Sequence, residues 1–304
     1  MVEETEKIWT DGKFIDWKDA KVHVLSHALH YGSAVFEGIR SYKTGKGSAI
    51  FRLKDHVDRL FNSAHIFGMK IPFSKHEFSE AIKKTVKINK LSDCYIRPVA
   101  FLGYGPMGLN PVNSPVKCSI AAWNWGAYLG EKGMKDGIRL KTSTFTRHHV
   151  NVSMTKTKIS GNYSNSVMAK REAVTQGFDE ALMLDTEGYV AECTGENIFI
   201  VKNNVVYTPS SNSILPGITR SSSITILKDL GFNVMEDKLS RDDIYVADEC
   251  FLTGTAAEIT PVREVDNRMI GIGMPGPVTN KLRKIYSDAV RGKISKYRKW
   301  NEYV

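Results

Sequence analysis

The spacing of apolar and polar residues in the first part of the chain changes between the two-residue period of strands and the longer period of helices. It predicts, in chain order, strands over 21–25, 35–42 and 49–53, helices over 54–67 and 74–88, and strands over 94–102 and 116–123. The sequence Thr-Gly-Lys-Gly at 44–47 predicts a hairpin turn between the second and third strands. We therefore expect a mixed α+β unit at the N-terminal end.

The segment 126–137 contains four glycines and several charges with little periodicity, so we expect it to link two domains. The expected domains are a small α/β domain over 1–125 and a larger one over 138–304. In the second domain the pattern predicts strands over 181–184, 189–192, 197–201 and 205–208, and helices over 163–175, 218–230 and 277–293. The predicted fold class is α/β, with strands and helices mixed in both domains.

Composition narrows the class of protein. The chain has 304 residues, 42% of them hydrophobic and 25% charged, which suffices for a substantial globular core. Its acidic start has no apolar run, and four separated cysteines form no CxxC pair, so we expect a soluble cytoplasmic protein without a disulfide framework. The formal net charge of +9 is spread along the chain except in the tail 281–299, where apolar residues alternate with Lys and Arg as in an amphipathic helix. We therefore expect neither a nucleic-acid partner nor a membrane partner.

Two motif-like segments are better explained by structure than by function. Residues 103–108 match GxGxxG, but Pro106 and the prolines that follow it prevent the helix that a dinucleotide site requires, so we predict a loop. His23, His27 and His30 have metal-like spacing, yet His23 falls in the predicted strand 21–25 and the three need not share a face. We expect no metal site.

The segment Lys158-Ile159-Ser160-Gly161-Asn162-Tyr163 places a lysine where a predicted strand gives way to a predicted helix. A lysine amine forms an imine with a carbonyl when burial or a nearby cation disfavours its ammonium form. Strand alternation directs Lys156 and Lys158 to the same face, so the pattern alone does not choose between them. Either side chain, taken by itself, is more often solvated.

Three further segments complete the requirements of a pyridoxal phosphate site, which needs an imine-forming lysine, an acid at the ring nitrogen and a phosphate site. Glu192 stands at a predicted strand end, as a candidate acid that keeps the ring protonated. Pro216-Gly217-Ile218-Thr219 predicts a helix N-terminus whose free N–H groups and hydroxyl suit a phosphate. Thr253-Gly254-Thr255-Ala256-Ala257 ends an apolar strand with small residues that leave backbone amides accessible. The structural alternatives are a surface glutamate for Glu192, a plain capping turn for 216–219 and a packing turn for 253–257.

Taken with these segments, several others resemble the branched-chain amino acid aminotransferases over nearly the whole chain. They are His30-Tyr31-Gly32, Phe36-Glu37-Gly38-Ile39-Arg40, Tyr95-Ile96-Arg97-Pro98, the segment 123–129 (Trp-Asn-Trp-Gly-Ala-Tyr-Leu) and the segment 254–262 (Gly-Thr-Ala-Ala-Glu-Ile-Thr-Pro-Val). The resemblance implies a fold-type IV pyridoxal phosphate enzyme with two α/β domains, the cofactor at their interface, and a homodimer or larger homo-oligomer.

The resemblance also assigns roles. Lys158, and not Lys156, is implied as the lysine that binds the cofactor and moves the proton of the substrate α-carbon. Tyr163 is implied at the ring oxygen and Glu192 at the ring nitrogen. The phosphate ligands implied are Arg59, Ile218, Thr219 and Thr255, with Leu215 also among the cofactor-binding residues.

The implied substrates are L-leucine, L-isoleucine and L-valine, with 2-oxoglutarate and glutamate as the second pair. Tyr95 and the backbone amides of Thr255 and Ala256 are implied at the α-carboxylate, and Arg97 at the distal carboxylate of glutamate. The remaining pocket residues implied by the resemblance, some from a neighbouring subunit, are Tyr31, Phe36, Gly38, Met107, Leu109, Trp125 and Tyr128.

Two alternatives differ in class. One is a transaminase of the same superfamily that acts on D-amino acids or (R)-amines, and the other is a cofactor-free binding protein that uses the basic surface. The short segment 95–97, combined with the segments 125–129 and 254–262, favours the branched-chain activity over the first alternative.

Overall fold

The computed structural model describes residues 2–126 and 129–304, which form two compact units. Unit 1 comprises Met1–Trp125, Thr157–Asn162 and Ala289–Val304, and unit 2 comprises Gly126–Lys156 and Tyr163–Asp288. The expected division at 126–137 did not include the two short segments that return to unit 1. Their placement depends on contacts with residues far away in the sequence.

Unit 1 is built on an antiparallel sheet in which eight strands of the described chain take part. Their order is β17 (Asn301–Tyr303), β5 (Gly47–Phe51), β4 (Ile39–Thr44), β6 (Cys94–Leu102), β7 (Val116–Trp123), β1 (Lys7–Thr10) and β2 (Lys13–Asp16), with β3 (Ala34–Phe36) paired to β6. The long β6–β7 pair runs from Tyr95 opposite Trp123 to Leu102 opposite Val116, at the predicted positions.

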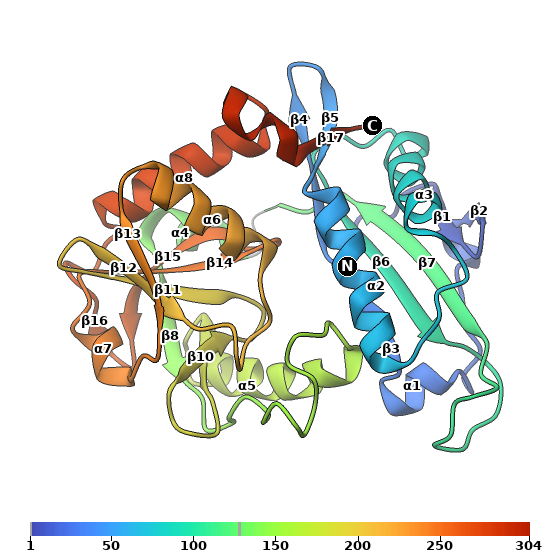
Figure 1. The fold of residues 1–304 in the computed structure, drawn as a ribbon, viewed down its shortest axis with the longest axis horizontal. Helices are drawn as coiled ribbons and strands as arrows, with labels where there is room; N and C mark the ends of the chain where they lie inside the picture. The colour runs from blue at the N-terminus through green and yellow to red at the C-terminus, as the bar shows by residue number, and fades with distance from the viewer. Residues whose placement is uncertain (1, 127–128) are drawn as a thin grey trace. The chain divides into compact units, whose positions relative to one another are not determined.

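Helices α2 (Leu53–Phe67) and α3 (Lys75–Ile88) lie against this sheet, while α1 (His27–Tyr31) is one short turn (Figure 1). Both long helices begin within one residue of the predicted positions. The start of α3 is fixed by a capping box, in which Ser74 and Glu77 exchange side-chain and backbone hydrogen bonds. The apolar faces of the two helices join the sheet in one core that includes Leu60, Phe78 and Ile120.

Two strand predictions in unit 1 were wrong. Residues 21–25 form no strand, and their apolar side chains Val22, Val24 and Leu25 are exposed, so their alternation does not serve packing within this chain. The predicted strand 35–42 is not continuous but is interrupted between β3 and β4, although both pair with β6 in one register, Phe36 opposite Val99 and Ile39 opposite Ile96. Between them the Glu37 N–H donates to Pro98 O, and Pro98 has no N–H to donate in return.

Unit 2 is built on a mixed sheet in which nine strands of the described chain take part. Their order is β10 (Val190–Cys193), β9 (Glu180–Leu184), β8 (Ile138–Thr142), β15 (Glu258–Val265), β14 (Glu249–Gly254), β11 (Asn197–Lys202), β12 (Val205–Pro209) and β13 (Asn233–Asp237), with β16 (Arg268–Met269) paired to β15. The pairs β8–β15, β8–β9 and β12–β13 are parallel and the others antiparallel.

The helices of the second half are α4 (Gly130–Asp136), α5 (Tyr163–Thr175), α6 (Ile218–Asp229), α7 (Arg241–Tyr245) and α8 (Pro277–Val290). Helices α5 and α6 agree with the prediction, and α8 ends three residues before the predicted 293. Helix α4 occupies part of the expected linker. In the described parts of the chain, no helix has both the length and the apolar content needed to cross a bilayer.

Candidate active site

Lys158 is held by backbone contacts within unit 1. Its N–H donates to Ser63 Oγ on α2 over 3.1 Å, its carbonyl accepts from Phe36 N–H over 3.1 Å, and Ile159 bridges Val35. The Lys158 Nζ lies 5.0 Å from the centroid of the Phe36 ring. The segment is not the predicted strand: turns and a bend at 155–157 precede Lys158, and a short 3-10 helix, Ser160–Asn162, follows Ile159.

Lys158 and Lys156 differ in surroundings. Lys158 is half-buried, whereas Lys156 is exposed and is counted in unit 2. The structure thus gives the two lysines different environments, which strand alternation did not distinguish.

A close approach between two glycines fixes the chain beyond Lys158. The Gly161 N–H donates to Gly32 O over 3.1 Å. Gly32 has a φ of +64°, and a Cβ at that position would lie 2.6 Å from the Gly161 Cα. Only glycine satisfies both the left-handed backbone and this contact.

Arg59 lies on α2 one turn before Ser63 and pairs with Glu37. The Arg59 Nε donates to Glu37 Oε1 over 2.6 Å, and Nη2 donates to Oε2 over 2.9 Å. Glu37 is completely buried, and its Oε2 also contacts His56 Nδ1 at 2.8 Å and accepts from Gly38 N–H over 3.2 Å. The guanidinium plane of Arg59 is therefore fixed before any phosphate binds.

The charges of this group are well defined. Burial alone would raise the pKa of Glu37, but the attraction of Arg59 and His56 lowers that pKa well below its ordinary value. Burial lowers the pKa of His56 more than the charge of Glu37 raises it. At neutral pH the group holds an anionic Glu37, a cationic Arg59 and an uncharged His56.

The predicted substrate residues on β3 and β6 are brought together. Arg97 Nη2 donates to Tyr95 Oη over 3.2 Å, and the Arg97 guanidinium lies 4.9 Å from the Phe36 ring centroid. The Tyr95 and Trp125 rings meet edge-on at 4.6 Å. Gly38 is required beside them, because a Cβ there would lie 1.9 Å from Tyr95 Oη.

The other predicted pocket residues of unit 1 are not enclosed by this chain. The Tyr31 hydroxyl donates to Met107 O over 3.0 Å, but the Tyr31 side chain is exposed, as is Leu109. The loop 103–108 that carries Met107 is not helical, as predicted. Tyr128 lies outside the described residues.

The two candidate metal-ligand histidines on α1 have other partners. His27 Nδ1 contacts Ser33 Oγ at 2.7 Å and its Nε2 contacts Gly108 O at 3.1 Å, while His30 Nε2 contacts Val24 O at 2.9 Å. Among the described residues there is no group of three or more His, Cys, Asp or Glu side chains arranged to hold a metal ion.

Glu192 is a carboxylate of unit 2 that several groups hold in place. It is buried near the end of β10, and three groups donate to it: Arg147 Nε to Oε1 over 2.6 Å, Asn197 Nδ2 to Oε2 over 3.1 Å, and the Leu215 N–H to Oε2 over 3.2 Å. Such a carboxylate is fixed in orientation and suited to accept a hydrogen bond from a protonated ring nitrogen. Sequence reasoning found Glu192 but missed Arg147 and Asn197, which no local motif marks.

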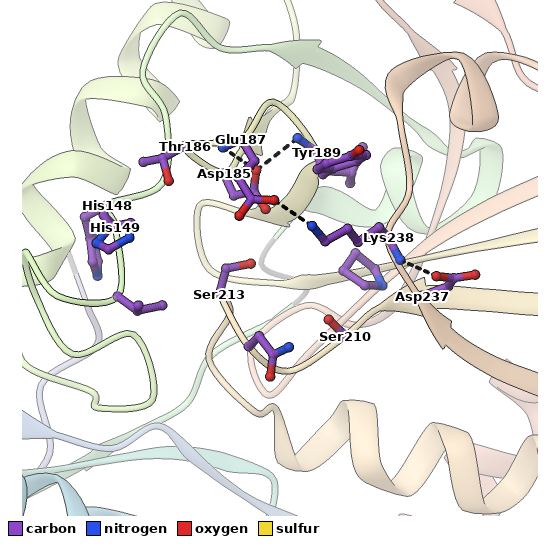
Figure 2. A pocket seen from close by; sticks show the side chains of 14 residues that line it. His148, His149, Asp185, Thr186, Glu187, Tyr189, Ser210, Ser213, Asp237 and Lys238 are labelled. Carbon is purple, nitrogen blue, oxygen red and sulfur yellow. Dashed lines mark hydrogen bonds and ion pairs between the residues drawn. The ribbon is translucent and has the colours of Figure 1, made fainter.

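Arg147 contacts His148 as well as Glu192. The Arg147 Nη1 lies 3.2 Å from His148 Nδ1. Burial and then the charge of Arg147 lower the pKa of His148 to about 4, so this imidazole is uncharged at neutral pH. His148 lines a pocket of about 270 Å³ in unit 2, in which Lys238 and Glu187 pair across 2.6 Å (Figure 2). The pocket includes none of the predicted site residues.

The predicted phosphate segment of unit 2 is a helix start. Gly217 is the N-cap of α6, and the helix begins at Ile218, with Thr219 buried in its first turn. Thr255 and Ala256 occupy the turn between β14 and β15, and Tyr163 begins α5. The N–H groups in the first turn of α6 form the positive pole of that helix, which a phosphate needs.

These residues fit pyridoxal phosphate in kind. Lys158 is fixed by its backbone, and the buried Glu192 carboxylate accepts hydrogen bonds from Arg147, Asn197 and Leu215. The oriented Arg59 and the start of α6, whose N-cap Gly217 makes no side-chain cap bond, offer donors of the kind that a phosphate accepts. None of these features alone identifies a reaction.

Comparison with known proteins supplies the family. Residues 34–265 match the family model "Amino-transferase class IV". A branched-chain-amino-acid aminotransferase of Pseudomonas aeruginosa is 53% identical over 304 residues, which cover 100% of this chain and 99% of that protein.

Solved structures agree. The T.th. branched-chain amino acid aminotransferase with pyridoxamine 5'-phosphate superposes with a TM-score of 0.97 at 51% identity, covering 100% of this chain and 99% of that one. The same enzyme complexed with N-(5'-phosphopyridoxyl)-L-glutamate gives a TM-score of 0.96 at 49% identity, with coverages of 100% and 99%. The predicted fold class, the mixed α/β fold-type IV enzymes, is confirmed. The chain therefore belongs to the class IV aminotransferases, within the branched-chain amino acid aminotransferases.

Proposed function

We propose that this chain transfers the amino group of L-leucine, L-isoleucine or L-valine to 2-oxoglutarate, giving L-glutamate and the branched 2-oxo acid. The observation that carries the choice of substrates is the contact of Arg97 with the Phe36 and Tyr95 side chains, with the Trp125 ring packed on Tyr95. Aromatic surfaces accept a branched aliphatic side chain, and the guanidinium accepts the distal carboxylate of glutamate. One pocket thereby serves both substrates.

The cofactor is pyridoxal 5'-phosphate, which when bound supplies an aldehyde carbon that exchanges amino groups and a ring that draws electrons from the substrate. Lys158 binds the cofactor through Nζ and then, as a free amine, moves the proton of the substrate α-carbon. Glu192 is assigned to the proton at the ring nitrogen, because Arg147, Asn197 and the Leu215 N–H donate to its carboxylate and fix its orientation. Tyr163 donates toward the ring oxygen.

The phosphate is assigned to Arg59 and to the start of α6, where Ile218 and Thr219 offer donors and Leu215 precedes them. Thr255 adds a further donor. At the other end of the substrate, Tyr95 and the amides of Thr255 and Ala256 are assigned to the α-carboxylate. Gly38 leaves room for the Tyr95 hydroxyl, since any side chain there would displace it.

We further propose that a second copy of this chain covers one face of unit 1. Val22, Val24, Leu29, Tyr31 and Leu109 are large apolar residues that stand exposed. A cavity of about 480 Å³ lies beside residues 20–26 and is lined by outward residues of β6 and β7, Arg97 among them. An exposed apolar surface of this kind is typical of a subunit interface, and a partner there would bring apolar side chains close to Arg97. The state proposed is a homodimer or a larger homo-oligomer.

A cytoplasmic location is part of the proposal. All four cysteines are free and buried, and burial raises the pKa of Cys94 and Cys118 to about 12, so they are unreactive thiols.

Half-reactions test the proposal. Protein loaded with pyridoxal phosphate is mixed separately with L-leucine, D-alanine and an (R)-arylamine, and the loss of the cofactor's visible absorbance is followed. L-leucine should react and the other two should not. Reaction with D-alanine or the arylamine in place of L-leucine would refute the proposed substrates. A colourless protein that borohydride does not label at Lys158 would refute the assignment of that lysine.

A further inference from the structure

Asn197 joins two parts of unit 2 that the sequence keeps apart. It begins β11, and its side chain is buried, with the residue 4% exposed. Its Nδ2 donates to Glu192 Oε2 over 3.1 Å and to the carbonyl of Leu215 over 3.0 Å. An amide nitrogen carries two hydrogens, so both bonds form at once. One side chain thus links the Glu192 carboxylate to the segment that leads into α6.

The link is closed on its other side. The Leu215 N–H donates to Glu192 Oε2 over 3.2 Å, and the Leu215 carbonyl accepts from Asn197 Nδ2. Leu215 therefore contacts both the carboxylate and the amide that is bonded to it. The turn also fits the amide closely, because a Cβ at Gly217 would lie 2.1 Å from Asn197 Oδ1. Neither the turn nor the amide can move far without disturbing the other.

We propose that Asn197 is a positioning residue that fixes the spacing between the Glu192 carboxylate and the N-terminus of α6. The inference rests on the proposed function, in which Glu192 meets the ring nitrogen and Ile218 and Thr219 meet the phosphate. Ring and phosphate belong to one molecule, so binding is strongest when the protein already holds both partners at the matching distance. Asn197 supplies that preorganisation without touching the cofactor.

Three variants separate this role from simple support of the fold. N197A removes both hydrogen bonds. N197D keeps the size of the side chain but replaces the donating nitrogen by an oxygen and sets a second carboxylate against Glu192. N301A is the matched control, because Asn301 is also a buried asparagine, 7% exposed, whose Nδ2 donates to Ala289 O over 2.9 Å within unit 1.

The measurement is the dissociation constant of pyridoxal phosphate and of pyridoxal, which lacks the phosphate, for each variant after dialysis of the loaded enzyme. N197A should weaken binding of pyridoxal phosphate about tenfold, the usual effect of losing a hydrogen bond to a charged group. Binding of pyridoxal should change much less, because pyridoxal does not bridge the two ends. N197D should show a larger loss, and N301A should keep the wild-type ratio of the two constants.

A second readout follows the ring end alone. The pH midpoint of the visible absorbance of the bound cofactor should move in N197A and N197D, because Glu192 is less firmly oriented, and should stay in place in N301A. The KM for glutamate should be unchanged while kcat falls, since Asn197 does not touch the substrate.

The outcomes are distinct. If N197A lowers thermal stability yet keeps the wild-type ratio of dissociation constants and the wild-type pH midpoint, Asn197 is only structural and the inference fails. N197D decides the question if N197A does not fold. If the wild type itself neither binds pyridoxal phosphate nor reacts with L-leucine, the proposed function and the inference both fail. Wild-type activity with unaffected variants overturns the inference alone.

Discussion

Replacing Glu37 by glutamine should destabilise unit 1 strongly, because it breaks a buried ion pair. The carboxylate accepts hydrogen bonds from Arg59 Nε and Nη2, contacts His56 Nδ1 and accepts from Gly38 N–H, and none of its surface reaches solvent. A glutamine accepts at one position only and presents an NH₂ group to donors at the other. Arg59, whose side chain is 12% exposed, then loses its anionic partner Glu37 and the two hydrogen bonds that it donates to it.

Breaking such a pair from one side costs about 3–5 kcal/mol. For a chain of this size, about 2 °C of melting temperature per kcal/mol is expected, so E37Q should melt roughly 6–10 °C below the wild type at pH 7. The matched control is D16N, which removes a carboxylate from the exposed pair of Asp16 and Lys7. It should leave the melting temperature unchanged, because solvent screens that pair.

The pH dependence has a defined sign. The pKa of Glu37 is lowered by folding, so its charge stabilises the native state above the unfolded pKa of about 4.3, and this stabilisation is lost as pH falls toward the folded pKa. The difference in melting temperature between wild type and E37Q should therefore be full at pH 7 and should shrink below about pH 4. Calorimetry at several pH values measures it. A difference equivalent to less than about 1 kcal/mol at pH 7 would refute the reasoning, since that is the value of an exposed pair.

Three further outcomes are expected. Lys158→Ala should abolish turnover and borohydride labelling but leave the affinity of the protein for phosphate nearly unchanged, because Arg59 and the start of α6 are separate contacts. If borohydride still labelled the K158A protein, Lys158 would not be the lysine that binds the cofactor. Arg97→Ala should lower kcat/KM for glutamate about ten- to hundredfold, because a charge-assisted hydrogen bond is lost. The kcat/KM for leucine should change less than about threefold. Steady-state kinetics measures both constants, and equal losses for the two substrates would contradict the role of Arg97. Gly32→Ala should lower the free energy of unfolding by more than the roughly 1–2 kcal/mol that a left-handed backbone costs, because the new Cβ would lie 2.6 Å from the Gly161 Cα. The control is Gly47→Ala, where φ is +111° and the space around the glycine is open, so only the backbone cost applies. Urea unfolding of both variants measures the difference.

Local signals were sufficient for many elements. The strands β6 and β7 alternate clearly over eight or nine residues, and α3 begins at a serine that caps it, so their bounds followed from neighbouring residues alone. The prediction of a strand at 21–25 was wrong, because alternation shows which residues are apolar but does not show which other segments cover them. In this chain Val22 and Val24 remain exposed.

The candidate site was predictable in composition but not in its supporting contacts. Glu192 and the helix start at Ile218 were proposed from residue type and position at element ends, while residue type left Lys156 and Lys158 open and the family resemblance chose Lys158. Glu37, Ser63, Arg147 and Asn197 were missed as partners, because nothing in their own segments distinguishes them from ordinary polar residues.

The sequence by itself determined the periodic elements, the breaks between them and the set of reactive groups, because these depend on residues a few positions apart. Only the tertiary structure showed how Lys158 is held, by pairing its N–H with Ser63 across 95 residues, and which donors fix Glu192, by bringing Arg147 to it across 45. Such contacts arise only when distant segments pack together, and a hydrogen bond between them leaves no periodic trace in either segment.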